Sequence, residues 1–296
     1  MIALCCALSA TSYAQRPRFG IKTGLNVSST IGGNETNSEG KIVDKYESKT
    51  GFQVGMSAAL PLSDVFGVQG EVLYTQRGSK YTYEDKGFYT LKSTFGAPLQ
   101  TKGDLRVVVQ NTNAYIELPI LVYVKPIKSL KIEAGISPML LLDSRGTGEF
   151  LLQNRTYTQN GSTNNPDMTI SLVYNYIGDG AAQSALKTET NTESISIAGD
   201  TYYYTAAEGA YYNNAEKPDG ENLYKFFDIG ANLGASYTFS SGLSFNLRGS
   251  YGLLDATNNR YERKYSTNTG APSYGIQQFD RDIRNFNVAL TVGFSF

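Results

Sequence analysis

The chain has 296 residues and carries 26 basic and 27 acidic side chains, for a formal net charge of −1. This balance leaves no basic excess of the kind that nucleic-acid binding requires. The chain contains no histidine, which excludes Ser/His/Asp and Cys/His catalysis and histidine-ligated zinc or haem. We therefore expect a protein that is not an enzyme and that holds no metal and no cofactor.

The first 14 residues have the features of a secretory signal peptide. Residues 1–10 are largely apolar, and residues 12–14 have the small-x-small form of a cleavage site. The usual positively charged start is missing, so the start of the sequence is either truncated or misassigned. Cleavage at this site would remove Cys5 and Cys6 and leave a mature domain, 15–296, without a disulfide or a thiolate metal site.

The rest of the chain has no apolar stretch of the roughly 20 residues that a transmembrane helix needs. Its longest apolar run is residues 120–124, so the chain is either soluble or crosses a membrane as strands. Eight segments alternate apolar and polar residues with the period of two that is typical of transmembrane strands of about 9–11 residues. These segments are 19–28, 51–60, 66–76, 115–125, 130–142, 225–239, 243–253 and 285–296.

The connections between these segments alternate between short and long. The short ones are 61–65, 126–129 and 240–242, and the long ones are 29–50, 77–114, 143–224 and 254–284. A soluble lipocalin-like barrel has no reason to separate its loops in this way. The pattern predicts an all-β fold, an eight-stranded antiparallel transmembrane β-barrel with short periplasmic turns and long extracellular loops, in the outer membrane of a Gram-negative bacterium.

Aromatic residues near the segment ends predict two girdles at the membrane surfaces. The residues are Phe19, Tyr74, Tyr115, Phe239, Tyr251 and Phe286.

The inward faces of the segments predict a charged lumen. Four cations and four anions face it: Lys22, Arg77, Lys131, Arg248, Glu71, Glu117, Glu133 and Asp228. An eight-stranded ring is just wide enough for its own side chains, and charges in a water-poor lumen are costly unless paired. We therefore predict a charge-paired plug, with either Glu71 or Glu117 as the partner of Arg248, rather than a proton or ion path.

Four apolar residues face the same lumen: Leu73, Leu121, Met139 and Leu141. They either pack beneath an inserted loop or indicate a slip in the register.

The third long connection, about 143–224, is nearly as large as a small domain and is rich in Asn, Thr, Ser, Gly and Tyr. It is either a variable outer loop, with or without a β-hairpin that extends the barrel wall, or a binding surface, because recognition loops use these residues. Two stretches with calcium-type oxygens, 219–222 and 255–259, lack the full EF-hand spacing and predict no metal site.

Six strand sequences form a distinctive set: FGIKTGLN at 19–26, GEVLYTQRG at 70–78, YIELPIL at 115–121, FDIG at 227–230, RGSY at 248–251 and GLL at 252–254. They resemble the PorT-like outer-membrane β-barrel family of Bacteroidetes, within the OmpA/OmpX-type superfamily of small barrels. The resemblance covers most of the chain outside the long connections. It implies fold and location more than activity, because function does not follow from a shared barrel.

The last segment alternates without a break to the final residue. Its apolar residues resemble the signal by which the barrel-assembly machinery recognises its clients: Phe286, Val288, Leu290, Val292, Phe294 and Phe296. We expect that machinery and outer-membrane lipid as partners, and no nucleic acid.

The sequence thus predicts an integral outer-membrane protein that is not an enzyme, with a plugged lumen and an envelope-structural or surface-binding role for its long loops. The alternative is a narrow porin, or a component of a secretion or uptake complex.

Overall fold

The computed structural model describes residues 16–93, 99–157, 167–177, 192–197, 199–205, 207–209, 222–258 and 281–296. The predicted signal peptide, 1–14, lies outside these residues. Among the described residues, no helix has the length and apolarity to cross a membrane. The strands are β1 (Arg18–Ile31), β2 (Asp44–Pro61), β3 (Phe66–Ser93), β4 (Leu99–Glu117), β5 (Ile120–Ile127), β6 (Leu130–Tyr157), β7 (Met168–Asn175), β8 (Thr192–Ile197), β9 (Asp200–Thr205), β10 (Ala207–Gly209), β11 (Phe227–Thr238), β12 (Leu243–Gly252) and β13 (Arg284–Ser295).

Eight antiparallel strand positions close into a ring, and we call each of them a wall. The walls follow the order β1, β2, β3, β4 with β5, β6, β11, β12 and β13, and β13 pairs with β1 from Gly20–Ser295 to Ile31–Arg284. A closed ring leaves no unpaired strand edge, which is the condition for a sheet in hydrocarbon. The predicted eight-stranded antiparallel barrel is confirmed.

One wall is interrupted where β4 ends and β5 begins, at Leu118 and Pro119. Proline has no backbone N–H to donate to a neighbouring strand. Its carbonyl nevertheless accepts from the Glu71 N–H at 2.9 Å, and the Leu118 N–H donates to the Pro138 carbonyl at 2.9 Å. The wall therefore remains bonded on both sides across the break.

The outer face of the ring is apolar because side chains alternate across each strand. On β13, Phe286, Leu290 and Phe294 are 37%, 57% and 46% exposed, whereas Ala289 and Thr291 are nearly fully buried. We call the exposed apolar side chains around the ring the outer belt. The girdle prediction is wrong for Tyr115, which is 1% exposed and faces the interior, on the same side of its strand as Glu117.

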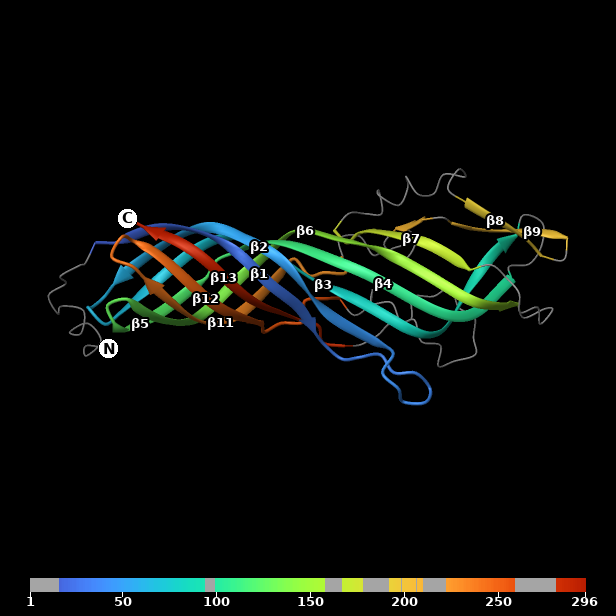
Figure 1. Cartoon of the computed structure of the whole chain (residues 1–296), viewed down its shortest axis with the longest axis horizontal. Helices are drawn as coiled ribbons and strands as arrows, with labels where there is room; N and C mark the ends of the chain where they lie inside the picture. The colour runs from blue at the N-terminus through green and yellow to red at the C-terminus, as the bar shows by residue number, and fades with distance from the viewer. Residues whose placement is uncertain are drawn as a thin grey trace, which may run out of the picture.

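The two ends of the ring differ in their connections (Figure 1). At one end lie the short turns 62–65, 128–129 and 239–242, together with the start of β1 and the end of β13. We call this the short-turn end. At the other end β3, β4 and β6 continue far beyond the ring, and we call it the extended end.

The strands that continue beyond the ring form a second part of the same sheet. β3 and β6 are 28 residues long and β4 is 19. We call residues 79–93, 99–112 and 144–157, together with β7, the extension. The connection 77–114 is thus mostly strand, and the first part of 143–224 continues β6 and returns as β7, so the barrel wall is extended well beyond the membrane-spanning length. At the far end the β8–β9 hairpin joins β3 through the pair Ser93–Tyr202.

The polarity of the two faces reverses along these strands. On β3 the inward residues change from Glu71 to Tyr83 and Leu91, and both of the latter are fully buried. The outward residues change from Val72, which is 50% exposed, to the charged Glu84. The extension therefore encloses an apolar core: Val43, Tyr81, Tyr83, Leu91, Leu99, Leu105, Val107, Val109, Tyr115, Met139, Leu141, Phe150, Leu152, Met168, Ile170, Leu172, Tyr174, Tyr176, Tyr202, Leu223 and Tyr224.

The four apolar residues predicted to face the lumen all lie inside it. Met139 and Leu141 form part of the extension core, which also includes Leu223 and Tyr224 from the segment before β11. Leu73 and Leu121 are 1% exposed within the ring. The predicted register is therefore correct for all four residues. For Met139 and Leu141, residues from the segment before β11 belong to the same apolar cluster.

Candidate functional site

Five charged side chains from four walls meet inside the ring. Lys22 comes from β1, Glu71 from β3, Lys131 and Glu133 from β6, and Arg248 from β12. Each lies at an inward position of its strand because the alternation puts apolar residues outside. We call these five residues the lumen cluster.

Arg248 is the centre of the lumen cluster. Its Nη1 and Nη2 donate to Glu71 Oε2 and Oε1 at 2.7 and 2.8 Å, and its Nε donates to Glu133 Oε1 at 2.9 Å. Arg248 and Glu71 thus form the two parallel bonds that a planar guanidinium makes with a carboxylate. Glu117 does not contact Arg248.

Two lysines complete the lumen cluster on the side of the short-turn end. Lys22 Nζ lies 2.7 Å from Glu71 Oε1, and Lys131 Nζ lies 2.9 Å from Glu133 Oε2. Gln69 links the two ion pairs, because its side-chain amide donates to Glu71 at 2.5 Å and accepts from Lys131 at 2.7 Å. Three cations therefore share two buried carboxylates, and the cluster has a net charge of +1.

The other three predicted lumen charges lie nearer the extended end. Arg77 Nη2 pairs with Glu117 Oε2 at 2.6 Å, and both side chains are almost fully buried. Asp228 is also buried, but it accepts hydrogen bonds from neutral groups: the Asn285 side-chain amide at 2.8 Å and the Ile229 N–H at 2.7 Å. The structure therefore brings together seven of the eight residues as ion pairs and leaves Asp228 in a neutral hydrogen-bond network.

This arrangement is suited to closing the lumen, and it leaves no carboxylate of the lumen cluster free for catalysis or metal binding. The carboxylates of Glu71 and Glu133 are occupied by cations, and no group of three or more Asp, Glu or Cys side chains that could hold a metal occurs among the described residues. Breaking a buried pair on one side leaves an uncompensated charge, which is strongly unfavourable. The lumen cluster is therefore held in place by its own pairing.

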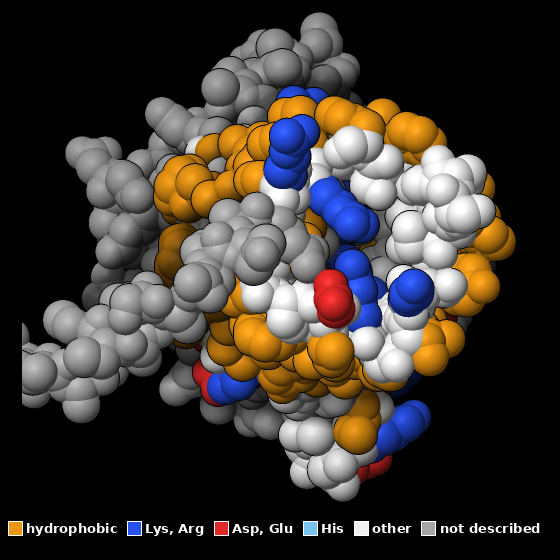
Figure 2. All heavy atoms as spheres, turned by 90° about the vertical axis from the view of Figure 1, so that its left-hand side faces the viewer, with side chains coloured by type: hydrophobic (Ala, Val, Ile, Leu, Met, Phe, Trp, Pro, Cys, Tyr) orange, Lys and Arg blue, Asp and Glu red, His pale blue; other side chains and the backbone are white. Residues whose placement is uncertain are grey.

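A second feature lies directly outside the lumen cluster, at the short-turn end, and sequence reasoning missed it. Figure 2 shows Lys and Arg side chains gathered around a hollow at this end, with an acidic side chain beside them, inside a rim of hydrophobic side chains. The hollow is a cavity of about 140 Å³ whose lining includes Arg18, Lys125 and Lys128 in addition to Lys22 and Lys131. Arg18 and Lys128 lie outside the alternating segments, at a strand start and in a turn, where the alternation pattern assigns no inward direction.

The outer face of the extension is charged and paired across strands. Lys86 on β3 contacts Asp104 on β4, and Arg106 Nε lies 2.9 Å from Glu84 Oε1. The hydrogen bond from Lys86 holds the pKa of Asp104 below its usual value. Pairs of opposite charge on neighbouring strands are typical of a sheet face in water, so the outer face of the extension differs from the outer belt.

The residues of the predicted assembly signal lie on the outer face of β13 and at its end. Phe286, Val288, Leu290, Val292 and Phe294 are 37–57% exposed, and Phe296 is 74% exposed. Their role in assembly stays a prediction.

Comparison with solved structures gives similar but distant chains. Ail of Yersinia pestis is 10% identical with a TM-score of 0.37, over 95% of this chain and 100% of Ail. OprG of Pseudomonas aeruginosa is 11% identical with a TM-score of 0.33, over 96% and 97%. The outer membrane protease OmpT of Escherichia coli is also similar, at 8% identity and a TM-score of 0.28, over 97% and 99%. Similarities this distant carry no argument about function.

The sequence comparison is more decisive. No curated protein is similar enough to count as a match, but residues 13–258 match the family described as the outer membrane protein beta-barrel domain. That match spans most of the chain and agrees with the closed ring, the apolar outer belt and the short turns gathered at one end. The chain belongs to the outer membrane protein beta-barrel domain family, and it is a protein of the outer membrane of a Gram-negative bacterium.

Proposed function

We propose that this protein is a closed, non-enzymatic barrel that anchors a folded β-structure, the extension, at the bacterial surface for binding. The short-turn end then faces the periplasm and the extended end faces the outside, as in bacterial barrels with short periplasmic turns. The outer belt contacts lipid, and the barrel-assembly machinery inserts the protein through the C-terminal strand. We propose no nucleic-acid partner.

The main observation in support of a closed lumen is that Arg248 bridges the ring. Its guanidinium, on β12, bonds Glu71 on β3 and Glu133 on β6, so one side chain connects three walls of the ring. An open channel would leave these charges facing water on one side. Here all three side chains are at most 5% exposed, and the apolar core of the extension lies beyond them.

The observation that supports a surface role is the construction of the extension. A barrel that only fills the membrane needs strands of about 9–11 residues, whereas β3 and β6 have 28. The added length folds around its own apolar core and shows a charged face outside. A preformed surface binds with less loss of conformational entropy than a flexible loop.

The finer family assignment rests on the resemblance of the strands to the PorT-like proteins of Bacteroidetes. We propose it as the relationship within the larger family. The absence of histidine from the sequence supports a non-enzymatic role, because the hydrolytic triads and dyads considered above need that side chain.

Planar-bilayer conductance of the purified protein tests the closed lumen. We expect no steady single-channel current from the native protein. The variant Arg248→Ala with Glu71→Ala and Glu133→Ala removes the bridge and should conduct, which shows that the protein is inserted and the assay works. A large, steady current from the native protein would refute the proposal.

Cysteine labelling in intact cells tests the orientation. Glu84 lies on the outer face of the extension and Ser241 lies in the turn between β11 and β12, at the short-turn end. We expect a membrane-impermeant maleimide to label Glu84→Cys in intact cells and Ser241→Cys only after lysis. The reverse result would overturn the proposed orientation.

One observation favours the alternative, a narrow water-filled path. Along the β1 and β13 walls, buried polar atoms of Asn26, Asn287 and Thr291 have no hydrogen-bond partner within the described part of the chain. Buried polar groups without protein partners are commonly satisfied by water. A small, anion- or cation-selective current in the same conductance experiment would favour a pore over the closed barrel.

A further inference from the structure

The cavity at the short-turn end has the composition of an anion site. Its lining contains Arg18, Lys22, Lys125, Lys128 and Lys131 and no aspartate or glutamate. Several neutral hydrogen-bonding side chains complete the lining: Ser57, Gln69, Tyr123, Ser129, Ser236, Thr238, Ser244, Asn246, Thr291 and Ser295. We call this cavity the basic pocket.

The cations of the basic pocket fall into two groups. Lys22 and Lys131 are held by the carboxylates of the lumen cluster beneath them. Arg18, Lys125 and Lys128 make no ion pair with any residue that the structure describes. A pocket lined by one sign of charge concentrates ions of the opposite sign, so these three side chains leave a surplus of positive charge at the mouth.

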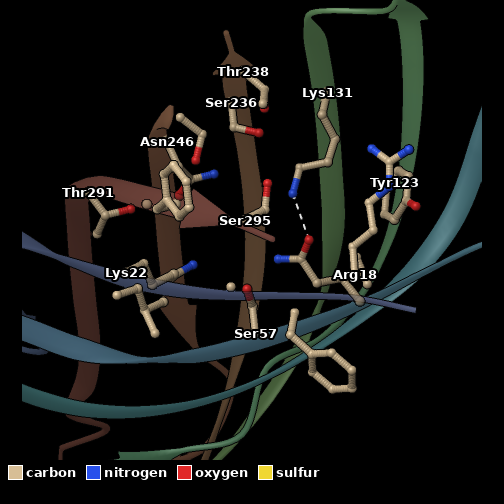
Figure 3. Close-up of a pocket in the computed structure, with 18 of the residues that line it drawn as sticks. Arg18, Lys22, Ser57, Tyr123, Lys131, Ser236, Thr238, Asn246, Thr291 and Ser295 are labelled. Atoms are coloured by element: carbon tan, nitrogen blue, oxygen red, sulfur yellow. Dashed lines mark hydrogen bonds between the residues drawn. The ribbon is translucent and has the colours of Figure 1, made fainter. Parts of the chain in front are cut away.

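Two cations of the basic pocket are positioned by an aromatic ring, whereas Arg18 and Lys128 are exposed at its mouth. Tyr123 is 4% exposed, and the ammonium groups of Lys125 and Lys131 each lie 5.5 Å from its ring centre. The ring is held against β3 because Gly67 has no side chain: a Cβ there would lie 2.4 Å from the Tyr123 hydroxyl. Figure 3 shows Lys131 and Arg18 on one side of the basic pocket and Lys22, Asn246 and Thr291 on the other.

A second observation points to a ligand in the same place. Thr291 is 1% exposed, and its Oγ1 has no hydrogen-bond partner within the described residues. The same holds for Oδ1 of Asn246, whose amide nitrogen donates to Glu133 at 2.9 Å. Both residues line the basic pocket. The Thr291 hydroxyl is thus a donor without a partner in the described part of the chain, on the side of the basic pocket opposite Arg18, whereas Asn246 Oδ1 offers only an acceptor.

The basic pocket is a dead end because the lumen cluster closes the ring directly behind it. Its volume of about 140 Å³ is roughly ten times the minimum that holds one water molecule, which leaves room for one small polyatomic group. A group with more than one negative charge fits three unpaired cations better than a single carboxylate does. A phosphate group has that charge and accepts the hydrogen bonds that Thr291 and the lysines can donate.

From this arrangement we infer that the basic pocket binds a phosphate group presented from the periplasm. The ligand is either a free phosphorylated small molecule or the headgroup of a phospholipid in the inner leaflet. The inference rests on the proposed function for the orientation of the barrel and for the closed lumen. The barrel would then recognise something on each side of the membrane, through the extension outside and the basic pocket inside.

Titration of the purified full-length mature protein with pyrophosphate tests the inference, in micelles of an uncharged detergent. We expect saturable binding by calorimetry, weakened as the ionic strength rises. Replacement of Arg18, Lys125 and Lys128 by glutamine should raise the dissociation constant at least tenfold. Thr291→Val, which keeps the shape and removes the hydroxyl, should raise it by a smaller factor.

A matched control replaces three cations of the extension, Lys80→Gln, Lys86→Gln and Arg106→Gln, which changes the net charge equally and should leave binding unchanged. All variants are first checked for the folded band on unheated gels. Absence of saturable binding by the native protein would overturn the inference. So would an equal loss of affinity in the control, because that result would indicate nonspecific attraction.

The source of the phosphate group is decided by a second probe. Native mass spectrometry after incubation with phosphatidylglycerol should show one bound lipid if a headgroup enters the pocket, and pyrophosphate should displace it. If pyrophosphate binds and the lipid does not, the ligand is a free molecule. Both outcomes support the phosphate site.

The failure of this inference is distinguishable from the failure of the proposed function. Binding with no ion current supports both. No binding and no current overturns the basic pocket alone. Binding together with a steady current that pyrophosphate blocks retains the phosphate site and refutes the closed barrel.

Discussion

The ring and the extension are built from the same strands but with opposite polarity. In the ring, Glu71 points in and Val72 points out, whereas twelve residues further along β3 Tyr83 points in and Glu84 points out. Both parts alternate with the period of two that every strand has. The period of two therefore determines which residues share a face, whereas the solvent around each part determines which face is apolar.

This contrast also explains what holds each part together. The interior of the ring is mostly polar, so it relies largely on paired charges and hydrogen bonds, with Arg248 at the centre. The extension stands in water and gains from burying residues such as Phe150 and Leu152. Substitutions of equal severity should therefore act by different mechanisms in the two parts.

The largest effect is expected from removing the central cation of the ring. Arg248→Met leaves Glu71 and Glu133 without their shared partner and should lower the free energy of unfolding by about 3–5 kcal/mol, the usual effect of breaking a buried ion pair. Urea titration in lipid vesicles, followed by the mobility of the folded band, measures it.

The control for this variant keeps the net charge of the lumen cluster at +1. Arg248→Met together with Glu71→Gln removes one charge of each sign and should be more stable than Arg248→Met alone. If the single variant is as stable as the native protein, the ion pairs do not hold the ring.

A substitution in the core of the extension should act locally. Leu152 is fully buried on β6, and Leu152→Ala should destabilise the extension by about 2–5 kcal/mol, as large-to-small core substitutions do. Hydrogen exchange followed by mass spectrometry should show faster exchange in residues 99–112 and in β7, with unchanged exchange in β12 and β13.

The matched control is Thr169→Ala, on the exposed face of β7. It should change stability by no more than about 0.5 kcal/mol. Loss of protection in the ring as well as in the extension would show that the two parts unfold as one unit.

Arginine substitutions on the outer face should distinguish positions that face lipid from positions that face water. Leu290 is 57% exposed on the outer belt, and Leu290→Arg should lower stability by about 2–4 kcal/mol if it lies near the middle of the bilayer. Gln110→Arg, on the exposed face of the extension, should be neutral. Urea titration in lipid vesicles compares them, and equal effects would place both positions in the same solvent.

The smallest effect is expected from an exposed ion pair. The hydrogen bond from Lys86 lowers the pKa of Asp104, so the pair stabilises the extension above the unfolded pKa of about 3.9 and loses this effect as the pH falls through the folded value. The contribution of such a pair is about 0.2–1 kcal/mol. Protease resistance of the extension should fall slightly at acid pH in the native protein, and Asp104→Asn should remove this part of the pH dependence.

The ring could be predicted from the sequence because each of its strands has a continuous apolar face. The sequence predicts long connections where the extension lies, with a β-hairpin as an open alternative only in 143–224, for two reasons. First, the expected length of a membrane strand ends each predicted segment early. Second, the inward residues of the extension and of the adjoining β9 are partly tyrosines, such as Tyr81, Tyr83 and Tyr202, and tyrosine also occurs in polar loops. The reversal of polarity between residues 77 and 81 predicts the end of a strand if the whole strand is assumed to face the same solvent, either lipid or water.

The content of the charged lumen could be predicted, but its pairing could not. Arg248 and Glu71 are 177 residues apart, and their contact depends on how far each strand is shifted against the next around the ring. The sequence offers Glu117 as an equally good partner of Arg248, yet Glu117 forms its ion pair with Arg77. The basic pocket was missed because Arg18 and Lys128 lie outside the alternating segments.

The change of solvent along β3 can be measured from the depth of two spin labels on one face of that strand. Val72→Cys and Glu84→Cys, each in a chain with Cys5 and Cys6 replaced by serine, both place a label on the outer face of β3. In lipid vesicles, we expect oxygen to relax the label at 72 and a water-soluble nickel complex to relax the label at 84. The same accessibility at both positions would contradict the reversal of solvent along the strand.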